Sequence, residues 1–334
     1  MTVTPIKSPS IAQKLKEISD HECKVSFSDF MQTALFHPED GYYTKVKNRV
    51  GRESRSDFFT SSSFKNLFAQ ILIESTSNLL ESSNQRPADF TWVEIGAEPN
   101  KALLDSIEHP FRGAETIRVG TDIKLKGKLI VFSNELFDAQ PCHSLVFDEE
   151  VWKERFVQIN DEGISFQLGK IKSPGLTPYL AKLPKLVPQG YTIDIPTGAD
   201  ALAGSILQQD WKGLFVAFDY GKTWKSLIHD TPQGSARAYK EHRQVTDLLA
   251  DAGDQDLTCH ICWDNITDTV ERHGFSKITL ESQESYIIKR APRVMQEAFN
   301  PANDAFSKQR SQLRQLIHPT LMGQKFQAIS AVKF

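Results

Sequence analysis

Apolar residues recur at helical spacing in three stretches near the start of the chain. Residues 11–18 (IAQKLKEI) and 27–36 (FSDFMQTALF) repeat large apolar side chains every three or four positions, which predicts two helices. The sequence HPEDGYY then marks a turn. A third helix is predicted over residues 64–80, FKNLFAQILIESTSNLL, with Ser61 to Ser63 as its N-terminal caps.

Three continuous apolar runs predict strands that are buried on both faces. They are FTWVEIGA (90–97), LIVFSNE (129–135) and GLFVAFDYGK (213–222). Helical patterns in KALLDSIEHPF (101–111) and ALAGSILQQDW (201–211) alternate with them. The order of these elements predicts an α/β fold with a parallel sheet, in which ligands bind beyond the carboxyl ends of the strands.

Residues 146–168 alternate polar and apolar side chains in a different way. This pattern is typical of a β-hairpin, with the turn at residues 161–163, and we interpret it as an inserted β element. The apolar stretch TIRVGTDI (116–123) is separated from LIVFSNE by only a few residues. Because a parallel crossover usually needs a dozen or more residues, we expect TIRVGTDI to run antiparallel or outside the main sheet. Asp122 would then lie at the wrong end to bind a cofactor.

Polar residues follow the second apolar run directly. In LIVFSNELFDAQP, Asn134, Glu135 and Asp138 emerge beyond the predicted strand, where an α/β sheet places its chemistry. The alternative is a strand followed by a helix, with Asn134 as the helix cap and Glu135 exposed in its first turn. This segment by itself favours neither interpretation.

Charge and cysteine content limit the classes of partner and compartment. The chain of 334 residues carries 39 Lys and Arg against 42 Asp and Glu, a net charge of −3, so neither a nucleic-acid nor a membrane partner is expected. No signal-peptide pattern is present at the start, and we expect a cytoplasmic protein. Cys259 and Cys262 form the one CxxC sequence, but its extended pattern points the two thiols to opposite faces. No metal site is therefore predicted.

Several segments, taken in order, resemble one family. The segments FSDFMQTALFHPEDGYY, SDFFTSSSFKNLFAQ, WVEIGA, VFSNELFDAQP, WKERFV, VPQGYTIDI, FVAFDYG, ARAYKEHR, DLTCHICWDNI and LMGQKFQAI occur along the chain in the family's order. They resemble the MidA-like family of S-adenosylmethionine-dependent methyltransferases, whose mitochondrial member is a protein arginine methyltransferase needed for complex I assembly. The resemblance implies a Rossmann-like methyltransferase sheet with an N-terminal helical cap and an inserted α/β element.

The resemblance also implies roles for residues in the matching motifs. Catalytic roles fall on Asn134, Glu135 and Asp138, because a guanidinium nucleophile needs carboxylates to orient it and to accept charge. The implied cofactor-binding residues are Asp57, Phe58, Thr60, Glu94, Gly96 and Ala97, and the implied substrate-side residues are Asp219, Tyr220 and His242. For Asp219 and His242 the alternatives are a turn residue and a surface histidine at a helix start.

The sequence departs from the family around the cofactor. The family's glycine-rich loop reads Gly96-Ala97-Glu98-Pro99-Asn100 here, which puts a carboxylate and a ring where close backbone approach is needed. The second strand and its helix are missing or rebuilt. The family motif G-D-F-x-T-A-P-E reads SDFFTSSS, which keeps Asp57, Phe58 and Thr60 and loses the proline and the glutamate.

These observations lead to one division of the chain and three hypotheses for its function. We expect a helical cap over residues 1–87, a methyltransferase-like core over 88–142 and 188–334, and an insertion with the hairpin over 143–187. The first hypothesis is S-adenosylmethionine-dependent methyl transfer to a protein side chain, with arginine as the acceptor that the resemblance implies. The alternative is a degenerate, non-catalytic relative that acts as a protein-binding or assembly factor. A third, an α/β enzyme for another nucleotide, has no specific support.

Overall fold

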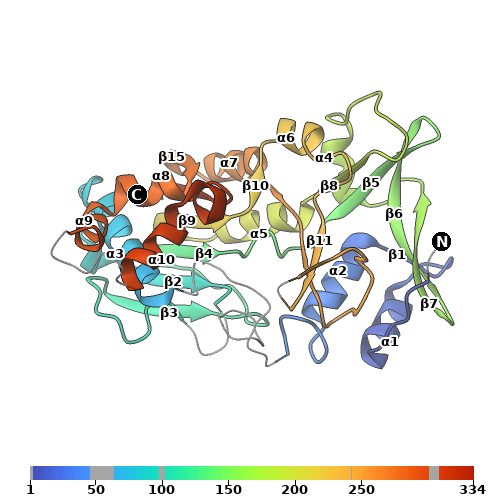
Figure 1. Ribbon diagram of the computed structural model, residues 1–334, viewed down its shortest axis with the longest axis horizontal. Helices are drawn as coiled ribbons and strands as arrows, with labels where there is room; N and C mark the ends of the chain where they lie inside the picture. The colour runs from blue at the N-terminus through green and yellow to red at the C-terminus, as the bar shows by residue number, and fades with distance from the viewer. Residues whose placement is uncertain (1–2, 46–63, 98–101, 242, 301–307) are drawn as a thin grey trace. The chain divides into compact units, whose positions relative to one another are not determined.

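The computed structural model describes residues 3–45, 64–97, 102–241, 243–300 and 308–334. Its contacts divide the chain into two compact units, each assembled from three segments (Figure 1). Unit 1 comprises Met1–Lys47, Phe137–Ala203 and Gly221–Ile266, and unit 2 comprises Asn48–Leu136, Gly204–Tyr220 and Thr267–Phe334. The predicted boundaries after residues 87, 142 and 187 stay a prediction.

Unit 2 contains a six-stranded sheet in the order β15-β16-β9-β4-β2-β3. The strands β3, β2, β4 and β9 are parallel to one another. Strand β16 pairs antiparallel with β9, and β15 pairs antiparallel with β16. Their bounds are β2 (Thr91–Ile95), β3 (Gly113–Ile117), β4 (Gly127–Asn134), β9 (Trp211–Asp219), β15 (Ser276–Ser282) and β16 (Gln327–Lys333). The three predicted buried strands are therefore confirmed as β2, β4 and β9, which lie side by side and in parallel.

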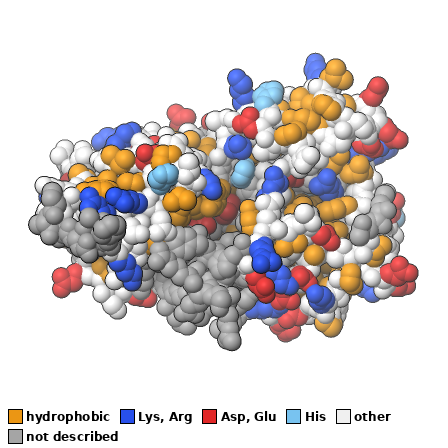
Figure 2. Space-filling view, in the orientation of Figure 1, with side chains coloured by type: hydrophobic (Ala, Val, Ile, Leu, Met, Phe, Trp, Pro, Cys, Tyr) orange, Lys and Arg blue, Asp and Glu red, His pale blue; other side chains and the backbone are white. Residues whose placement is uncertain are grey.

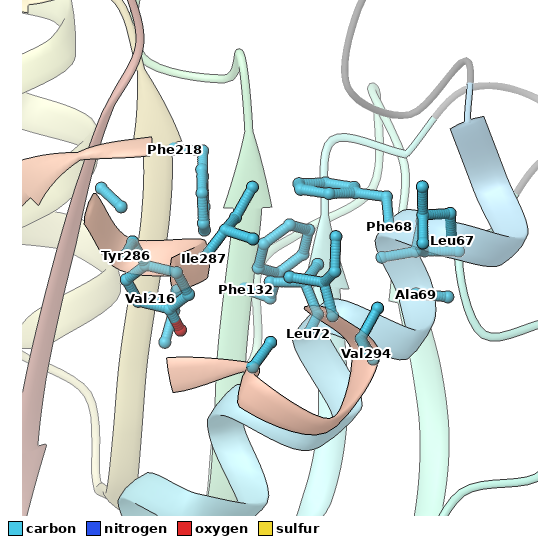
Figure 3. Close-up of a cluster of buried hydrophobic side chains, with 14 of the residues drawn as sticks. Leu67, Phe68, Ala69, Leu72, Phe132, Val216, Phe218, Tyr286, Ile287 and Val294 are labelled. Atoms are coloured by element: carbon cyan, nitrogen blue, oxygen red, sulfur yellow. The ribbon is translucent and has the colours of Figure 1, made fainter. Parts of the chain in front are cut away.

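Helices cover one face of this sheet and form the larger core with it. Phe132 of β4 and Phe218 of β9 contact Phe68 of the predicted third helix, with ring centroids 6.3 and 5.6 Å apart (Figure 3). Tyr286 packs edge-on against Phe218 from the other side. The covering helices are α3 (Lys65–Glu81), α8 (Gln283–Arg290), α9 (Pro292–Ala298) and α10 (Lys308–Ile317), followed by a π-helical turn at Pro319–Gly323.

Unit 1 contains a five-stranded sheet, to which the expected insertion 143–187 contributes β5, β6 and β7 and to which β1 and β8 also belong. Its order is β1-β6-β5-β8, with β7 paired to β6. The predicted hairpin is confirmed: β6 and β7 pair antiparallel from Asn160↔Gly163 outward, which places the turn at residues 161 and 162. The strands are β1 (Lys24–Ser26), β5 (His143–Asp148), β6 (Val151–Asn160), β7 (Gly163–Gly169) and β8 (Thr192–Ile195).

The rest of unit 1 consists of short strands and helices. The two predicted N-terminal helices are confirmed as α1 (Pro9–Ile18) and α2 (Phe27–Phe36). Helices α5 (Thr197–Leu207) and α7 (Trp263–Arg272) pass from unit 1 into unit 2 along the chain. The remaining elements of unit 1 are α4 (Thr177–Leu180), α6 (Trp224–His229), β10 (Gly221–Lys222), β11 (Arg237–Lys240), β12 (Arg243–Val245), β13 (Asp256–Thr258), β14 (Ile261–Cys262) and a 3-10 turn at Pro174–Leu176, while the 3-10 turn at Pro87–Asp89 belongs to unit 2.

The predicted helix over residues 101–111 is wrong. Its described part, 102–111, consists of turns and bends. The backbone N–H of Leu103 donates to the Glu94 side chain over 2.7 Å, and Ser106 has a φ of 64°, in the left-handed region that interrupts a helix. Leu103 and Leu104 are buried in the core of unit 2, so the apolar residues of this segment reflect contact with the core rather than helical structure.

The expectation for TIRVGTDI is wrong for Thr116 and Ile117, because they belong to β3, which runs parallel to β2 in the main sheet. Residues 118–123 lie outside the sheet, as expected, but Asp122 follows the carboxyl end of a parallel strand and so is not at the opposite end. Strands β3 and β4 flank β2, and residues 118–126 connect them. At roughly 3.3 Å per residue this link reaches about 30 Å, whereas a strand of 5 residues such as β2 is only about 17 Å long. An extended link can therefore return the chain without a crossover helix.

The helices themselves give one further fact. Among the helices in the described ranges, none has both the length and the apolar character needed to span a membrane.

Candidate functional site at the carboxyl edge of the parallel strands

Most of the predicted site residues in unit 2 lie at one edge of its sheet. Strands β2, β4 and β9 are in parallel register from Thr91↔Leu129 and Leu129↔Gly213 onward, so their carboxyl ends meet at the same edge. The structure brings together there Glu94, Gly96, Ala97, Asn134, Glu135, Asp219 and Tyr220. The sequence predicted this group because each residue ends an apolar run.

Gly96 makes the turn that follows β2. Its φ is +84°, and a Cβ added to it would lie 2.8 Å from Cδ1 of Leu136. Its N–H still donates to the Ile117 carbonyl over 2.9 Å, which extends the β2–β3 ladder by one residue. Gly96 therefore makes a tight turn at the carboxyl edge with Leu136 packed against it, and the positive φ of this turn favours glycine.

Glu94 has a structural contact close to this turn. The side chain is only 9% exposed, and its Oε2 accepts the N–H of Leu103. The carboxylate thus fixes the segment that replaces the predicted helix. The cofactor-binding role of Glu94 stays a prediction, as do those of Gly96 and Ala97.

The end of β4 shows that the helix-cap alternative is wrong. Glu135 has a φ of 52° and is followed by bends and turns, with no helix among the described residues 135–142. Its N–H donates to the Phe218 carbonyl over 2.9 Å, which extends the pairing of β4 with β9. The Asn134 amide donates to Glu135 Oε1 over 2.9 Å, so the two side chains orient each other.

Two buried oxygen atoms at this edge have no hydrogen-bond partner among the described residues. They are Oδ1 of Asn134 and Oγ of Ser133. A buried acceptor without a partner costs free energy, which a bound group with N–H or O–H donors would recover. S-adenosylmethionine carries such donors in its ammonium, ribose and adenine groups, so the residues present fit this cofactor. Ser133 was not among the predicted site residues, although a serine that ends an otherwise apolar run was a usable signal.

The carboxyl end of β9 is held from the C-terminal segment. Asp219 is fully buried, and its Oδ1 accepts the N–H of Tyr220 over 2.9 Å. The ring of Tyr220 packs on Phe326 with centroids 3.9 Å apart, and Gln327 pairs with Asp219 in the sheet. The LMGQKF motif thus supports the FDYG motif, and the substrate-side roles of Asp219 and Tyr220 stay predictions.

The other predicted site residues lie elsewhere or outside the described ranges. Asp138 belongs to unit 1, where it is 5% exposed and its carbonyl accepts the N–H of Cys259. Its catalytic role stays a prediction. Asp57, Phe58, Thr60 and His242 lie outside the described residues, as do Ser61 to Ser63 and the loop residues Glu98 to Asn100.

The CxxC segment is part of the interior of unit 1. Cys259 lies 3.3 Å from Ser235 Oγ, and burial raises the pKa of Cys262 to about 12. Burial also lowers the pKa of His260 to about 4. Within the described parts of the chain, no three His, Cys, Asp or Glu side chains are grouped so as to hold a metal ion.

The parallel strands with their site at the carboxyl edge define a Rossmann-like α/β fold of the methyltransferase class. A family described as "Putative S-adenosyl-L-methionine-dependent methyltransferase" matches residues 60–280. The chain belongs to this family, and S-adenosylmethionine is the cofactor of the family.

Solved structures agree with this fold. The chain is similar to a superfamily member from Burkholderia thailandensis bound to S-adenosylhomocysteine, with a TM-score of 0.83, 21% identity, and coverage of 99% of this chain and 95% of that one. A native crystal structure of an uncharacterized protein from the same organism gives a TM-score of 0.80, with the same identity and coverage. A comparison with curated proteins finds no match.

Proposed function

We propose that this protein binds S-adenosylmethionine at the carboxyl edge of β2 and β4 and transfers the methyl group to a protein side chain, with arginine as the acceptor. The buried Oδ1 of Asn134, which has no hydrogen-bond partner among the described residues and lies at the same strand edge as the turn at Gly96, carries the proposal. The family and the S-adenosylhomocysteine bound to the Burkholderia thailandensis structure support the cofactor. Membership of the MidA-like branch, a cytoplasmic location and the absence of nucleic-acid and membrane partners are part of the same proposal.

The chemistry requires little beyond positioning and charge. When bound, the cofactor supplies an electrophilic methyl group on a sulfonium, which a nucleophile attacks in line. An arginine nucleophile stays protonated at neutral pH, so a carboxylate must hold the guanidinium and accept its proton as the new bond forms. Glu135 is suited to this, because Asn134 orients its carboxylate at the strand end.

A non-catalytic assembly or binding factor is the second candidate. The sequence feature that favours it is the loop Gly96-Ala97-Glu98-Pro99-Asn100, in which Glu98 would repel the carboxylate of the cofactor's methionine group. This candidate predicts an intact fold without cofactor affinity, so cofactor binding separates it from the enzyme.

Glu135→Ala should reduce methyl transfer about a hundredfold and change cofactor affinity less than threefold, because its carboxylate acts on the acceptor. The measurement uses methyl-labelled S-adenosylmethionine with an arginine-rich peptide library and a lysine-rich library of the same lengths. Glu115→Ala removes an exposed carboxylate from β3, the edge strand on the other side of β2, and is the matched control. An equal loss of transfer and cofactor affinity would place Glu135 on the cofactor side, and label in the lysine library alone would contradict arginine as the acceptor.

A further inference from the structure

A long stretch of unit 1 carries positive charge only. Residues 163–193 contain four lysines and no aspartate or glutamate, in a chain whose net charge is −3. Lys172 pairs with Asp20 and Glu22. The side chains of Lys182 and Lys185 are exposed and form no ion pair with the described residues. This part of unit 1 is therefore a local basic surface.

Exposed leucines lie between these lysines. Leu180 is 39% exposed and Leu186 is 85% exposed, in a run of sequence that reads YLAKLPKLVP. Figure 2 shows hydrophobic and Lys or Arg side chains next to one another where Figure 1 places α4 and α6. We call Leu180, Lys182, Lys185 and Leu186 the lysine–leucine surface.

Two tryptophan side chains hold the backbone of residues 182–184 in place. Trp152 Nε1 donates to the Pro184 carbonyl over 2.9 Å, and Trp224 Nε1 donates to the Lys182 carbonyl over 3.4 Å. Both rings pack against the buried cluster around Leu145, Tyr179 and Ile193. The leucines therefore project from a fixed backbone. Binding of a partner would then cost little conformational entropy in this segment.

We propose that the lysine–leucine surface is a docking site for a protein segment that presents apolar side chains flanked by carboxylates. Exposed leucines on a rigid support supply apolar anchors. Lys185 and Lys182, whose ammonium lies 5.9 Å from the centre of the Trp224 ring, form no ion pair with a described residue and select an acidic partner. The half-buried Trp152 and Trp224 are the residue type that most often contributes binding energy at protein interfaces.

The surroundings favour a protein segment over an anionic membrane. Gln189, at the end of the segment, donates to Asp148 and accepts the N–H of Glu149, so an acidic turn borders the surface. Glu150 and Val151 follow in the same turn, both exposed. Lys153 pairs with Asp148 and Glu149, which leaves Glu150 as the exposed carboxylate that a flat anionic membrane would meet together with the lysines. A narrow peptide can lie along the lysines alone.

The test is calorimetric titration of the full chain with a helical peptide of leucine and glutamate. The same peptide with lysine in place of glutamate is the comparison, and vesicles with and without phosphatidylserine are the membrane probe. We expect the acidic peptide to bind, with an affinity that falls as salt is raised, and the basic peptide and both vesicles not to bind. The double substitution Lys182→Glu with Lys185→Glu should lower the affinity for the acidic peptide at least tenfold.

Lys126→Glu with Lys212→Glu is the matched control, since both lysines are exposed and belong to unit 2. It should leave peptide affinity unchanged, and both pairs of substitutions should leave S-adenosylhomocysteine binding as in the parent chain. Equal binding of the two peptides, no binding of either, or binding to the anionic vesicles alone would overturn the proposal. None of these results depends on methyl transfer.

Discussion

Gly96→Ala is expected to weaken S-adenosylhomocysteine binding at least tenfold while the protein stays folded. The new Cβ would lie 2.8 Å from Cδ1 of Leu136, so the leucine side chain must move at the edge where the cofactor is proposed to bind. A tenfold loss of affinity corresponds to about 1.4 kcal/mol, which one displaced contact at a turn can account for. Titration calorimetry of the parent chain and of the variant with S-adenosylhomocysteine measures this loss of affinity.

Gly127→Ala is the control for Gly96→Ala. Gly127 has a φ of +90°, close to the +84° of Gly96, so alanine carries a similar backbone cost of about 1–2 kcal/mol at both positions. No atom lies within 4 Å of its added Cβ, and it begins β4 at the opposite edge of the sheet. Equal losses of affinity in the two variants would show that backbone strain, and not the site at Gly96, controls binding.

Asp194→Ala should lower the free energy of unfolding by about 3–5 kcal/mol. Asp194 is 3% exposed, and its Oδ2 accepts the backbone N–H groups of Ser235 and Ala236 over 2.7 Å each. Burial lowers the pKa of Arg155, and the negative charge of Asp194 opposes that shift. Alanine would leave two buried donors unsatisfied and would remove the negative charge that favours the cationic form of the half-buried Arg155. Unfolding in urea, followed by tryptophan fluorescence, measures the loss.

Two further variants make the Asp194 result specific. Asp122→Ala removes a carboxylate that is 84% exposed and paired only with the exposed Lys124, so it should change stability by less than about 0.5 kcal/mol. Arg155→Met combined with Asp194→Ala should destabilise less than the sum of the single variants, because the unpaired cation is then absent. A loss below about 1 kcal/mol for Asp194→Ala would mean that the interior of unit 1 tolerates the missing charge.

The apolar pattern predicted the strands well, because a strand that is buried on both faces needs a nearly continuous run of apolar residues. LIVFSNE and GLFVAFDYGK form neighbouring parallel strands. Glu135 and Asp219 therefore lie at the same edge of the sheet, as the sequence predicted. The pattern failed over residues 102–111, where Leu103 and Leu104 are buried in a segment of turns and bends that forms no helix. The contact that decides this segment, from Leu103 N–H to Glu94, joins residues whose pairing no local pattern reveals.

Other features of the site depend on contacts that sequence does not display. The unsatisfied oxygens of Ser133 and Asn134 become visible only when the neighbouring strands are in place. The position of β3 in the sheet was mispredicted because the minimum crossover length assumes a helix, and the extended link 118–126 has none among its residues. Local pattern therefore predicts which residues end the strands, and packing determines what those residues contact.

The most direct test of the proposed function is calorimetric titration of the unmodified chain with S-adenosylhomocysteine. The account predicts one site per chain with micromolar affinity, reduced at least tenfold by Gly96→Ala and unchanged by Gly127→Ala. No binding at millimolar ligand would contradict it, and the loop Gly96-Ala97-Glu98-Pro99-Asn100 would then mark a family member that has lost its cofactor.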